Sequence, residues 1–224
     1  MKFKLKISNS GFTIVELLVA TAISGIVLTG IYSSYYSQQK SYVAQGQVSS
    51  MQQNLRAALY HMEREIRMAG YDPNRGEGAG IQTTNTDSIR VTMDITDNSG
   101  TGDPDGDAGD AGEDITYSIA DTDGDGDNDL ARNDANGSGT QTVAEDVDAL
   151  NLVYLNEEGS TTSTLSEIRS VQISIVARTG RVDPGYTNNN AYSNQQGTVI
   201  YTASGDSYRR KFLTEQVKCR NLGL

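Results

Sequence analysis

The sequence predicts an α+β fold in which one long N-terminal α-helix packs on a mainly antiparallel β-sheet with long loops. Three observations carry this prediction: a nearly uncharged apolar run near the N-terminus, an apolar stripe with helical spacing after it, and later segments in which apolar and polar residues alternate. Apolar residues three and four positions apart share one face of a helix, whereas alternation places them on one face of a strand. With 224 residues, the chain can hold one membrane helix and one globular domain of ordinary size.

The apolar run spans residues 12–31 and contains a single charge, Glu16. A helix of about 20 residues, rising about 1.5 Å per residue, crosses a hydrocarbon core of about 30 Å. Lys2, Lys4 and Lys6 precede the run, and basic residues before a span hold that end in the cytoplasm. We therefore expect a transmembrane helix over residues 12–31, with the following domain on the other side of the membrane.

The helix is expected to continue in amphipathic form over residues 32–70, because no proline occurs before Pro73. Gly70 is a natural residue to end it, and Asp72-Pro73 prevents continuation. The recurring apolar positions predict a stripe that packs on the protein's own head domain. They are Val48, Met51, Leu55, Ala58, Leu59, Met62, Ile66 and Ala69.

Residues 71–224 are predicted to form a β-rich head domain. The strand candidates combine alternation with β-branched or aromatic residues and are separated by turn-rich connectors. They are residues 88–95, 115–119, 149–155, 171–178, 199–202 and 208–219. The connectors 97–112 and 182–197 are longer than most loops, and such loops are more often functional or disordered than part of a core.

The composition excludes several classes of function. A net charge of −11 argues against a nucleic-acid-binding surface, which needs a basic face. No nucleophile motif, phosphate-binding loop or His/Cys cluster is present, so we expect no enzymatic activity. His61, the one histidine, falls in the helical stripe region and is expected at a surface or interface. Cys219, the one cysteine, cannot form an internal disulfide, and the sequence places no base beside it.

Gly11-Phe12, with Thr13 and Glu16, forms the pattern Gly-Phe-Thr-x-x-Glu at the head of the apolar run. A secretory signal would place its small-residue cleavage site after the apolar run, whereas this junction lies before it. The pattern resembles the class III signal of type IV prepilins and of type II secretion pseudopilins. The resemblance implies that residues 1–11 are a leader and that prepilin peptidase cuts between Gly11 and Phe12. It also implies that the new N-terminus at Phe12 is methylated and that the helix remains in the product.

Glu16 has two interpretations. An ionised carboxylate in lipid costs several kcal/mol unless it is paired, and charges in spans are usually functional or near the interface. Lying about one turn from the membrane surface, Glu16 could reach the headgroups. The resemblance implies instead that Glu16 pairs with the α-ammonium of Phe12 in a neighbouring subunit, so that subunits enter a helical filament in the correct axial register.

Finer similarities extend along most of the chain, although the first thirty or so residues are the most diagnostic. These segments look like those of PilW-type minor pilins, which are related to the J-type minor pseudopilins of type II secretion. The resemblance implies the pilin fold. The segments are residues 64–71, 115–117, 130–132, 169–173, 177–178, 208–212 and 220–222.

One acidic loop has a residue pattern that suggests a metal-binding site. Carboxylates at alternate positions, with a glycine at the sixth, match the start of an EF-hand loop, and Ca²⁺ takes six to eight oxygen ligands. The candidate ligands are Asp121, Asp123, Asp125, Asp127 and Asp129. Arg132 occupies the twelfth position, which rules out a standard EF-hand and leaves the last ligand to Asp134, Glu113 or Asp114. The alternative is a solvated acidic hairpin tip without metal.

A second acidic run, residues 103–110, has Ala108 where the sixth-position glycine would be. It is expected to be a flexible loop that contributes at most one ligand to a cation site.

We expect a structural subunit: a minor pilin that is processed by prepilin peptidase and takes part in initiating type IV pilus assembly, with the pilus tip as a possible position. Its partners would be other minor and major pilins, the prepilin peptidase, the inner-membrane pilus assembly platform and membrane lipid. It would first span the inner membrane once, with a cytoplasmic N-terminus and a periplasmic head, and then reside in the extracellular pilus.

Three alternatives stay open. A minor pseudopilin of type II secretion would share the helix and the leader. A calcium-dependent adhesin would use the loops and the twelve tyrosines to bind a surface or glycan. A signal-anchored periplasmic domain would require the Gly11-Phe12 junction and Glu16 to be coincidental.

Overall fold

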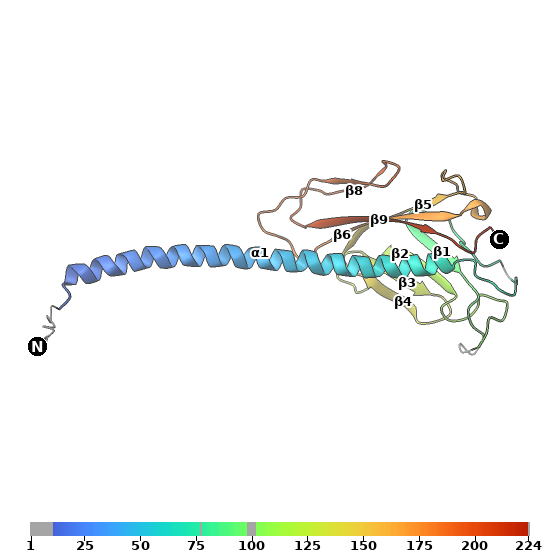
Figure 1. Ribbon diagram of the computed structural model, residues 1–224, viewed down its shortest axis with the longest axis horizontal. Coiled ribbons are helices and arrows are strands. Elements are labelled where there is room, and N and C mark those ends of the chain that lie inside the picture. The colour runs from blue at the N-terminus through green and yellow to red at the C-terminus, as the bar shows by residue number, and fades with distance from the viewer. Residues whose placement is uncertain (1–10, 77, 98–101, 224) are drawn as a thin grey trace, which may run out of the picture. The chain divides into compact units, whose positions relative to one another are not determined.

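The computed structural model describes residues 11–76, 78–97 and 102–223. Lys2, Lys4 and Lys6, and with them most of the predicted leader, lie outside the described residues. One long helix, α1 (Ile14–Met68), is followed by the strands of the head (Figure 1). The predicted α+β architecture is confirmed, and the helix bounds agree with the expected ones to within two residues.

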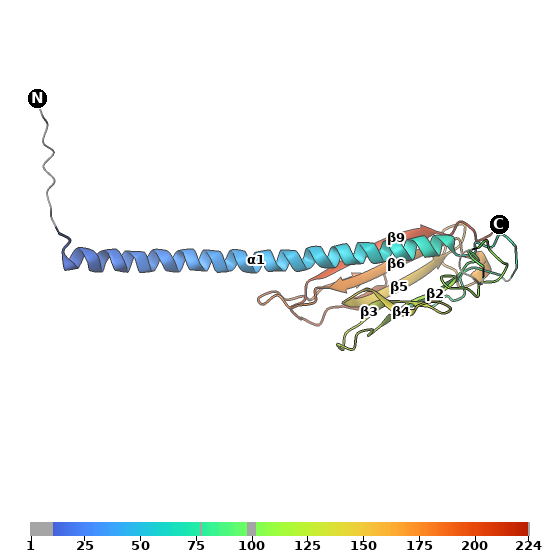
Figure 2. The ribbon, with the colours of Figure 1, turned by 90° about the horizontal axis from the view of Figure 1, so that it is seen from below.

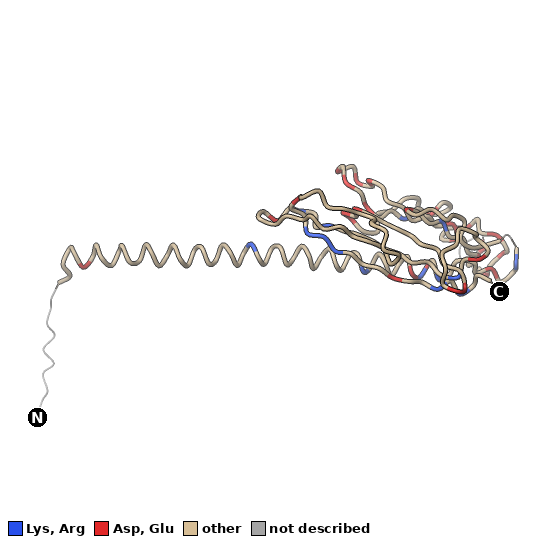
Figure 3. Tube along the Cα trace, turned by 90° about the horizontal axis from the view of Figure 1, so that it is seen from above, with Lys and Arg blue, Asp and Glu red and all other residues tan. Residues whose placement is uncertain are grey.

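The chain divides into two compact units, Met1–Gln45 and Gly46–Leu224. In the described part of the first unit, the helix from Ile14 on exposes nearly all of its side chains, including the large apolar residues of the span. Its length and apolar composition are sufficient to cross a membrane. Between Glu16 and Lys40 it carries no Asp, Glu, Lys or Arg (Figure 3).

In the part of the second unit that the structure describes, the strands form two antiparallel sheets and a hairpin. The first sheet has the order β1 (Ser88–Thr92), β2 (Asp114–Ala120), β3 (Asp129–Asp134) and β4 (Gly139–Ala144). The second has the order β5 (Val147–Leu155), β6 (Ser170–Arg178) and β9 (Arg210–Lys218). A short 3₁₀ helix (Leu165–Glu167) lies between β5 and β6, and β7 (Ala191–Ser193) pairs with β8 (Val199–Thr202).

The C-terminal half of α1 lies along both sheets and shares one core with them (Figures 1 and 2). Five helical side chains at spacings of three and four are buried: Met51, Leu55, Ala58, Met62 and Ile66. They join the inward residues of both sheets in a single cluster that includes Ile89, Ile115, Leu152, Ile173 and Ile175. The helical stripe predicted from spacing is therefore the helix's contribution to the core.

A polar contact fixes the helix against the first sheet inside this packing. The Tyr117 hydroxyl on β2 donates to Glu65 Oε2 at 2.6 Å, and Arg132 Nη2 on β3 lies 2.9 Å from Glu65 Oε1. The Tyr117 side chain is fully buried, and Glu65 and Arg132 are each less than one-fifth exposed. Burial and then the charge of Glu65 raise the pKa of Tyr117 far above its ordinary value, so the phenol remains a donor at physiological pH.

Sequence patterns located the strands with apolar alternation and missed the polar ones. β2, β5, β6, β8 and β9 lie where strands were predicted. β1 ends at Thr92 rather than at residue 95, because the chain then turns and the Asp94 amide donates to the Tyr71 carbonyl at 2.7 Å. β3, β4 and β7 were not predicted, since their sequences DLARND, GTQTVA and AYS hold too few apolar residues to alternate.

The contact between Tyr117 and Glu65 predicts a measurable coupling. We expect Tyr117→Phe and Glu65→Gln each to lower the free energy of unfolding by about 2 kcal/mol, the scale of a hydrogen bond to a charged group. The double variant should lower the free energy of unfolding by less than the sum of the two single effects, because both changes remove the same bond. The measurement is urea unfolding of the full chain in detergent, followed by near-ultraviolet circular dichroism.

Tyr60→Phe is the matched control, because Tyr60 lies on the same helix and is 65% exposed. It should change the unfolding free energy by less than about 0.5 kcal/mol. Strict additivity of Tyr117→Phe and Glu65→Gln would contradict the coupling.

Candidate functional site

The N-terminal end of α1 is closed by a capping box between Thr13 and Glu16. The Thr13 amide and hydroxyl each donate to Glu16 Oε2 at 2.8 Å, and the Glu16 amide donates to the Thr13 hydroxyl at 3.2 Å. This reciprocal arrangement satisfies backbone donors that have no partner within the helix, and it places a negative charge at the positive end of the helix dipole. Glu16 therefore has a structural role in its own chain, which the Thr-x-x-Glu spacing could have revealed.

The predicted cleavage position is accessible. Gly11 and Phe12 precede the helix without regular structure, Phe12 is 91% exposed, and nothing within 4 Å would meet a Cβ at Gly11. An exposed, non-helical peptide bond directly before a capped helix can enter a protease site without unfolding the helix. Cleavage at Gly11, methylation of Phe12 and pairing of Glu16 stay predictions.

The acidic loop between β2 and β3 brings three of its five predicted ligands together. Asp121, Asp123 and Asp125 each offer a carboxylate oxygen, and these oxygens lie within 4.8 Å of one another. All three side chains are exposed, and they shape the loop themselves. Asp121 Oδ1 accepts from the Gly124 amide at 2.7 Å and Asp121 Oδ2 from the Gly126 amide at 3.2 Å.

The other two predicted ligands contact protein groups instead. Asp127 pairs with the guanidinium of Arg178, and Asp129 accepts from the Thr122 amide at 3.2 Å and the Asp146 amide at 3.2 Å. Burial raises the pKa of Asp127, which the charge of Arg178 opposes. A calcium ion in this loop would thus use the three exposed carboxylates, and the site stays a prediction.

A second carboxylate cluster lies in the connection between β1 and β2. Oxygens of Asp105, Asp107 and Asp110 also lie within 4.8 Å of one another, although this run was expected to be a flexible loop. The loop is held in place, since the Gly106 amide donates to Asp94 Oδ2 at 3.0 Å. Because this contact joins residues twelve positions apart, sequence spacing gave no signal for it.

The two residues weighed as catalytic groups have ordinary structural surroundings. His61 is exposed on α1, and its ring meets the edge of Tyr60 with centroids 6.3 Å apart. Cys219 is 2% exposed, and burial raises the pKa of its thiol to about 12.

Comparisons with known proteins give two family matches. Residues 116–221 match the family model described as type IV pilus-assembly protein W, and residues 7–32 match the prokaryotic N-terminal methylation motif. No curated protein matched the chain. Among solved structures, the fold is similar to a type IV-like pilin from Thermus thermophilus with 15% identity and a TM-score of 0.49, covering 77% of this chain and 97% of that one.

The burial of Cys219 predicts that its thiol is inert in the folded chain. At pH 8, a pKa of about 12 leaves about one thiolate in ten thousand, and the thiolate is the form that reacts. We expect iodoacetamide to leave the native chain unmodified and to alkylate it fully in denaturant, as measured by intact mass. Cys219→Ser, which has no thiol, is the negative control. Rapid alkylation of the native chain would contradict the prediction.

Proposed function

We propose that the chain is a type IV minor pilin that takes part in initiating pilus assembly, on the basis of its matches to the pilus-assembly protein W family model and to the N-terminal methylation motif. The observation that carries the proposal is a single helix, α1, with two kinds of surface. Its first part carries no Asp, Glu, Lys or Arg between Glu16 and Lys40 and exposes apolar side chains, whereas its C-terminal half supplies one stripe to the core of the head. Such a helix anchors a folded head first in a membrane and then in a filament.

The exposed apolar surface needs a nonaqueous partner. Ile14, Leu17, Leu18, Ile26 and Leu28 are each more than 60% exposed. Lipid would cover these side chains in a single-pass inner-membrane form with a cytoplasmic N-terminus and a periplasmic head. Helices of other minor and major pilins would cover them after the assembly platform has moved the subunit into a pilus.

Glu16 is proposed to change partners during this transfer. In the single subunit its carboxylate is held by Thr13. After cleavage by prepilin peptidase, the methylated α-ammonium at Phe12 of a neighbouring subunit would offer a full positive charge. The capping donors are neutral, whereas the attraction between two opposite charges is strengthened by an apolar surrounding. The pair would set the axial register between subunits.

The mechanism proposed is association rather than catalysis. A pseudopilin of type II secretion would use the same helix and leader, and the match to the pilus-assembly family model favours the pilus. Deletion of the gene separates the two, since a pilin is needed for piliation and a pseudopilin for secretion of folded enzymes.

The processing step predicts a defined mature chain. In cells with active prepilin peptidase, we expect the membrane-extracted protein to begin at methylated Phe12, and in cells without the peptidase to retain Met1 or Lys2. Intact mass and N-terminal sequencing measure both. A leader that remains attached in peptidase-competent cells would overturn the prepilin assignment.

Variants at Thr13 and Glu16 separate capping from subunit pairing. Glu16→Gln keeps an acceptor for the capping box but removes the charge, so we expect it to be processed and yet not to enter filaments. Thr13→Ala removes the cap at a cost of about 1 kcal/mol and keeps the charge, so it should enter filaments at nearly the normal level. The measurement is the amount of each variant in sheared pili.

The opposite pattern, in which Glu16→Gln assembles normally and Thr13→Ala does not, would restrict Glu16 to capping its own helix.

A further inference from the structure

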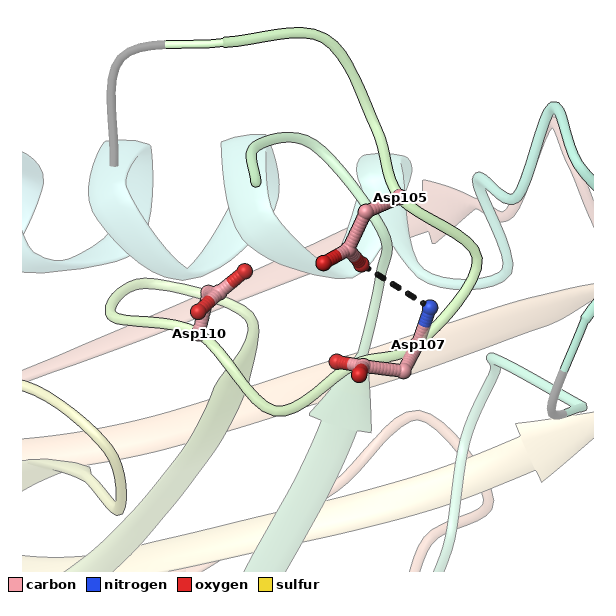
Figure 4. Close-up of side chains that lie close together, drawn as sticks. All are labelled: Asp105, Asp107 and Asp110. Carbon is pink, nitrogen blue, oxygen red and sulfur yellow. Dashed lines mark hydrogen bonds between the residues drawn. The ribbon is translucent and has the colours of Figure 1, made fainter. Parts of the chain in front are cut away.

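The connection between β1 and β2 folds three carboxylates toward a common point beside the C-terminal end of α1. Figure 4 shows the side chains of Asp105, Asp107 and Asp110 converging from one loop, and one oxygen of each lies within 4.8 Å of the others. Asp105 Oδ1 accepts from the Asp107 amide at 3.2 Å, the contact drawn in the figure. Acidic loops of this kind are common, so the loop alone does not make a site.

A fourth carboxylate, which is buried, contacts the backbone of this loop. Asp94, two residues beyond β1, is 1% exposed, and its Oδ2 accepts from the Gly106 amide between Asp105 and Asp107 at 3.0 Å. Its second oxygen, Oδ1, is buried without a hydrogen-bond partner. A buried carboxylate oxygen without a donor costs free energy of several kcal/mol unless the group is neutralised or binds a cation.

Two further unpartnered oxygens belong to the same region. Asp110 Oδ2 and Asp72 Oδ1 are buried and have no hydrogen-bond partner. Asp94 lies close to Asp72 as well, because the Asp94 amide donates to the carbonyl of Tyr71, the preceding residue, at 2.7 Å. Among the residues that the structure describes, the buried side-chain atoms without a partner are these three aspartate oxygens, and none lies in the loop at 121–129.

Glu113 shows what a compensated carboxylate looks like in this environment. It is fully buried, but its Oε1 accepts from the amides of Ile95 at 2.7 Å and Thr96 at 2.8 Å, and its Oε2 accepts from the Asp110 amide at 3.1 Å. Both carboxylate oxygens of Glu113 therefore have donors, and these bonds hold the loop in position. Asp94 and Asp110 retain an oxygen for another ligand.

The loop is fixed where it carries these groups. A Cβ at Gly76 would meet the Gly106 carbonyl oxygen at 1.8 Å, so the two backbones touch at a spacing that only glycine allows. Gly106 itself has φ +100, a left-handed conformation that favours glycine. The carboxylates therefore converge in a backbone that is already shaped.

We propose that Asp94, Asp105, Asp107 and Asp110 bind one Ca²⁺ ion, with Asp72 at its edge. The donor set is entirely carboxylate oxygen, which suits a hard cation and not zinc or copper. Four carboxylates from one irregular loop and one buried turn can supply the six to eight ligands of Ca²⁺, with waters completing the shell, whereas Mg²⁺ needs near-octahedral geometry. This site is separate from the predicted one at 121–129.

Calcium titration of the full chain in detergent, after removal of metals with a chelator, tests the proposal. The probe is CaCl₂ alone, and the readouts are bound Ca²⁺ per chain by calorimetry and the thermal midpoint of the head with and without EGTA. Asp94→Asn keeps an acceptor for the Gly106 amide and removes the charge. We expect it to weaken Ca²⁺ binding at this site by tenfold or more and to raise the midpoint in EGTA, because a buried charge is gone.

Further variants distinguish the two acidic loops and keep the test valid if Asp94→Asn does not fold. Asp107→Asn removes an exposed ligand and should weaken binding even if Asp94→Asn does not fold. The double variant Asp123→Asn/Asp125→Asn should leave the Asp94-dependent binding unchanged. Calcium binding that is unaffected by Asp94→Asn and Asp107→Asn, no binding at millimolar Ca²⁺, or equal saturation by Mg²⁺ would each overturn the proposal.

Discussion

Burial of one stripe of α1 is the constraint on which the head depends. Met51, Leu55, Met62 and Ile66 contribute to a core that also takes residues from both sheets, so the helix supplies a surface that the two sheets share. A three-stranded and a four-stranded sheet would each leave an apolar face uncovered without it. Because the same continuous helix also carries the apolar run, the element that stabilises the head is the element that anchors it.

The head carries an excess of acidic residues, and it compensates its buried carboxylates in two ways. Several pair with arginines: Glu65 with Arg132, and both Asp148 and Asp206 with Arg210, whose side chain is 1% exposed and lies 2.6 Å from each. Others, such as Glu113, accept from backbone amides. A buried charge is tolerated when each oxygen has a donor, and removal of one partner from such a pair is costly. Asp94 and Asp110 each keep one buried oxygen that has no donor, which is why they stand out among the carboxylates of the head.

Features set by local periodicity were predictable, and features set by long-range contacts were not. The helical stripe and strands such as β6 follow from the spacing of apolar residues, because a buried face needs them at regular intervals. β4 has polar residues on both faces and owes its pairing to β3, which a local pattern cannot show. Thr13 was predictable from its spacing to Glu16 and was not recognised as a cap. Asp94 falls within the strand predicted over residues 88–95, but β1 ends at Thr92, and the Asp94 side chain accepts from the Gly106 amide of another loop, a contact that no local pattern shows.

The two acidic loops show why ligand spacing is a weak guide to cation binding. The loop at 121–129 has the more regular carboxylate pattern, yet Asp127 is neutralised by Arg178 and the buried Asp129 accepts from backbone amides. Its other three carboxylates are exposed, where water solvates them at little cost. The loop at 103–110 has the poorer pattern but contacts Asp94, a buried carboxylate that has one oxygen without a hydrogen-bond donor. The gain from a cation is largest where the protein alone leaves charge uncompensated. A cation there would join the β1–β2 connection to the turn after α1, and would thus strengthen the head at the end of the helix that anchors it.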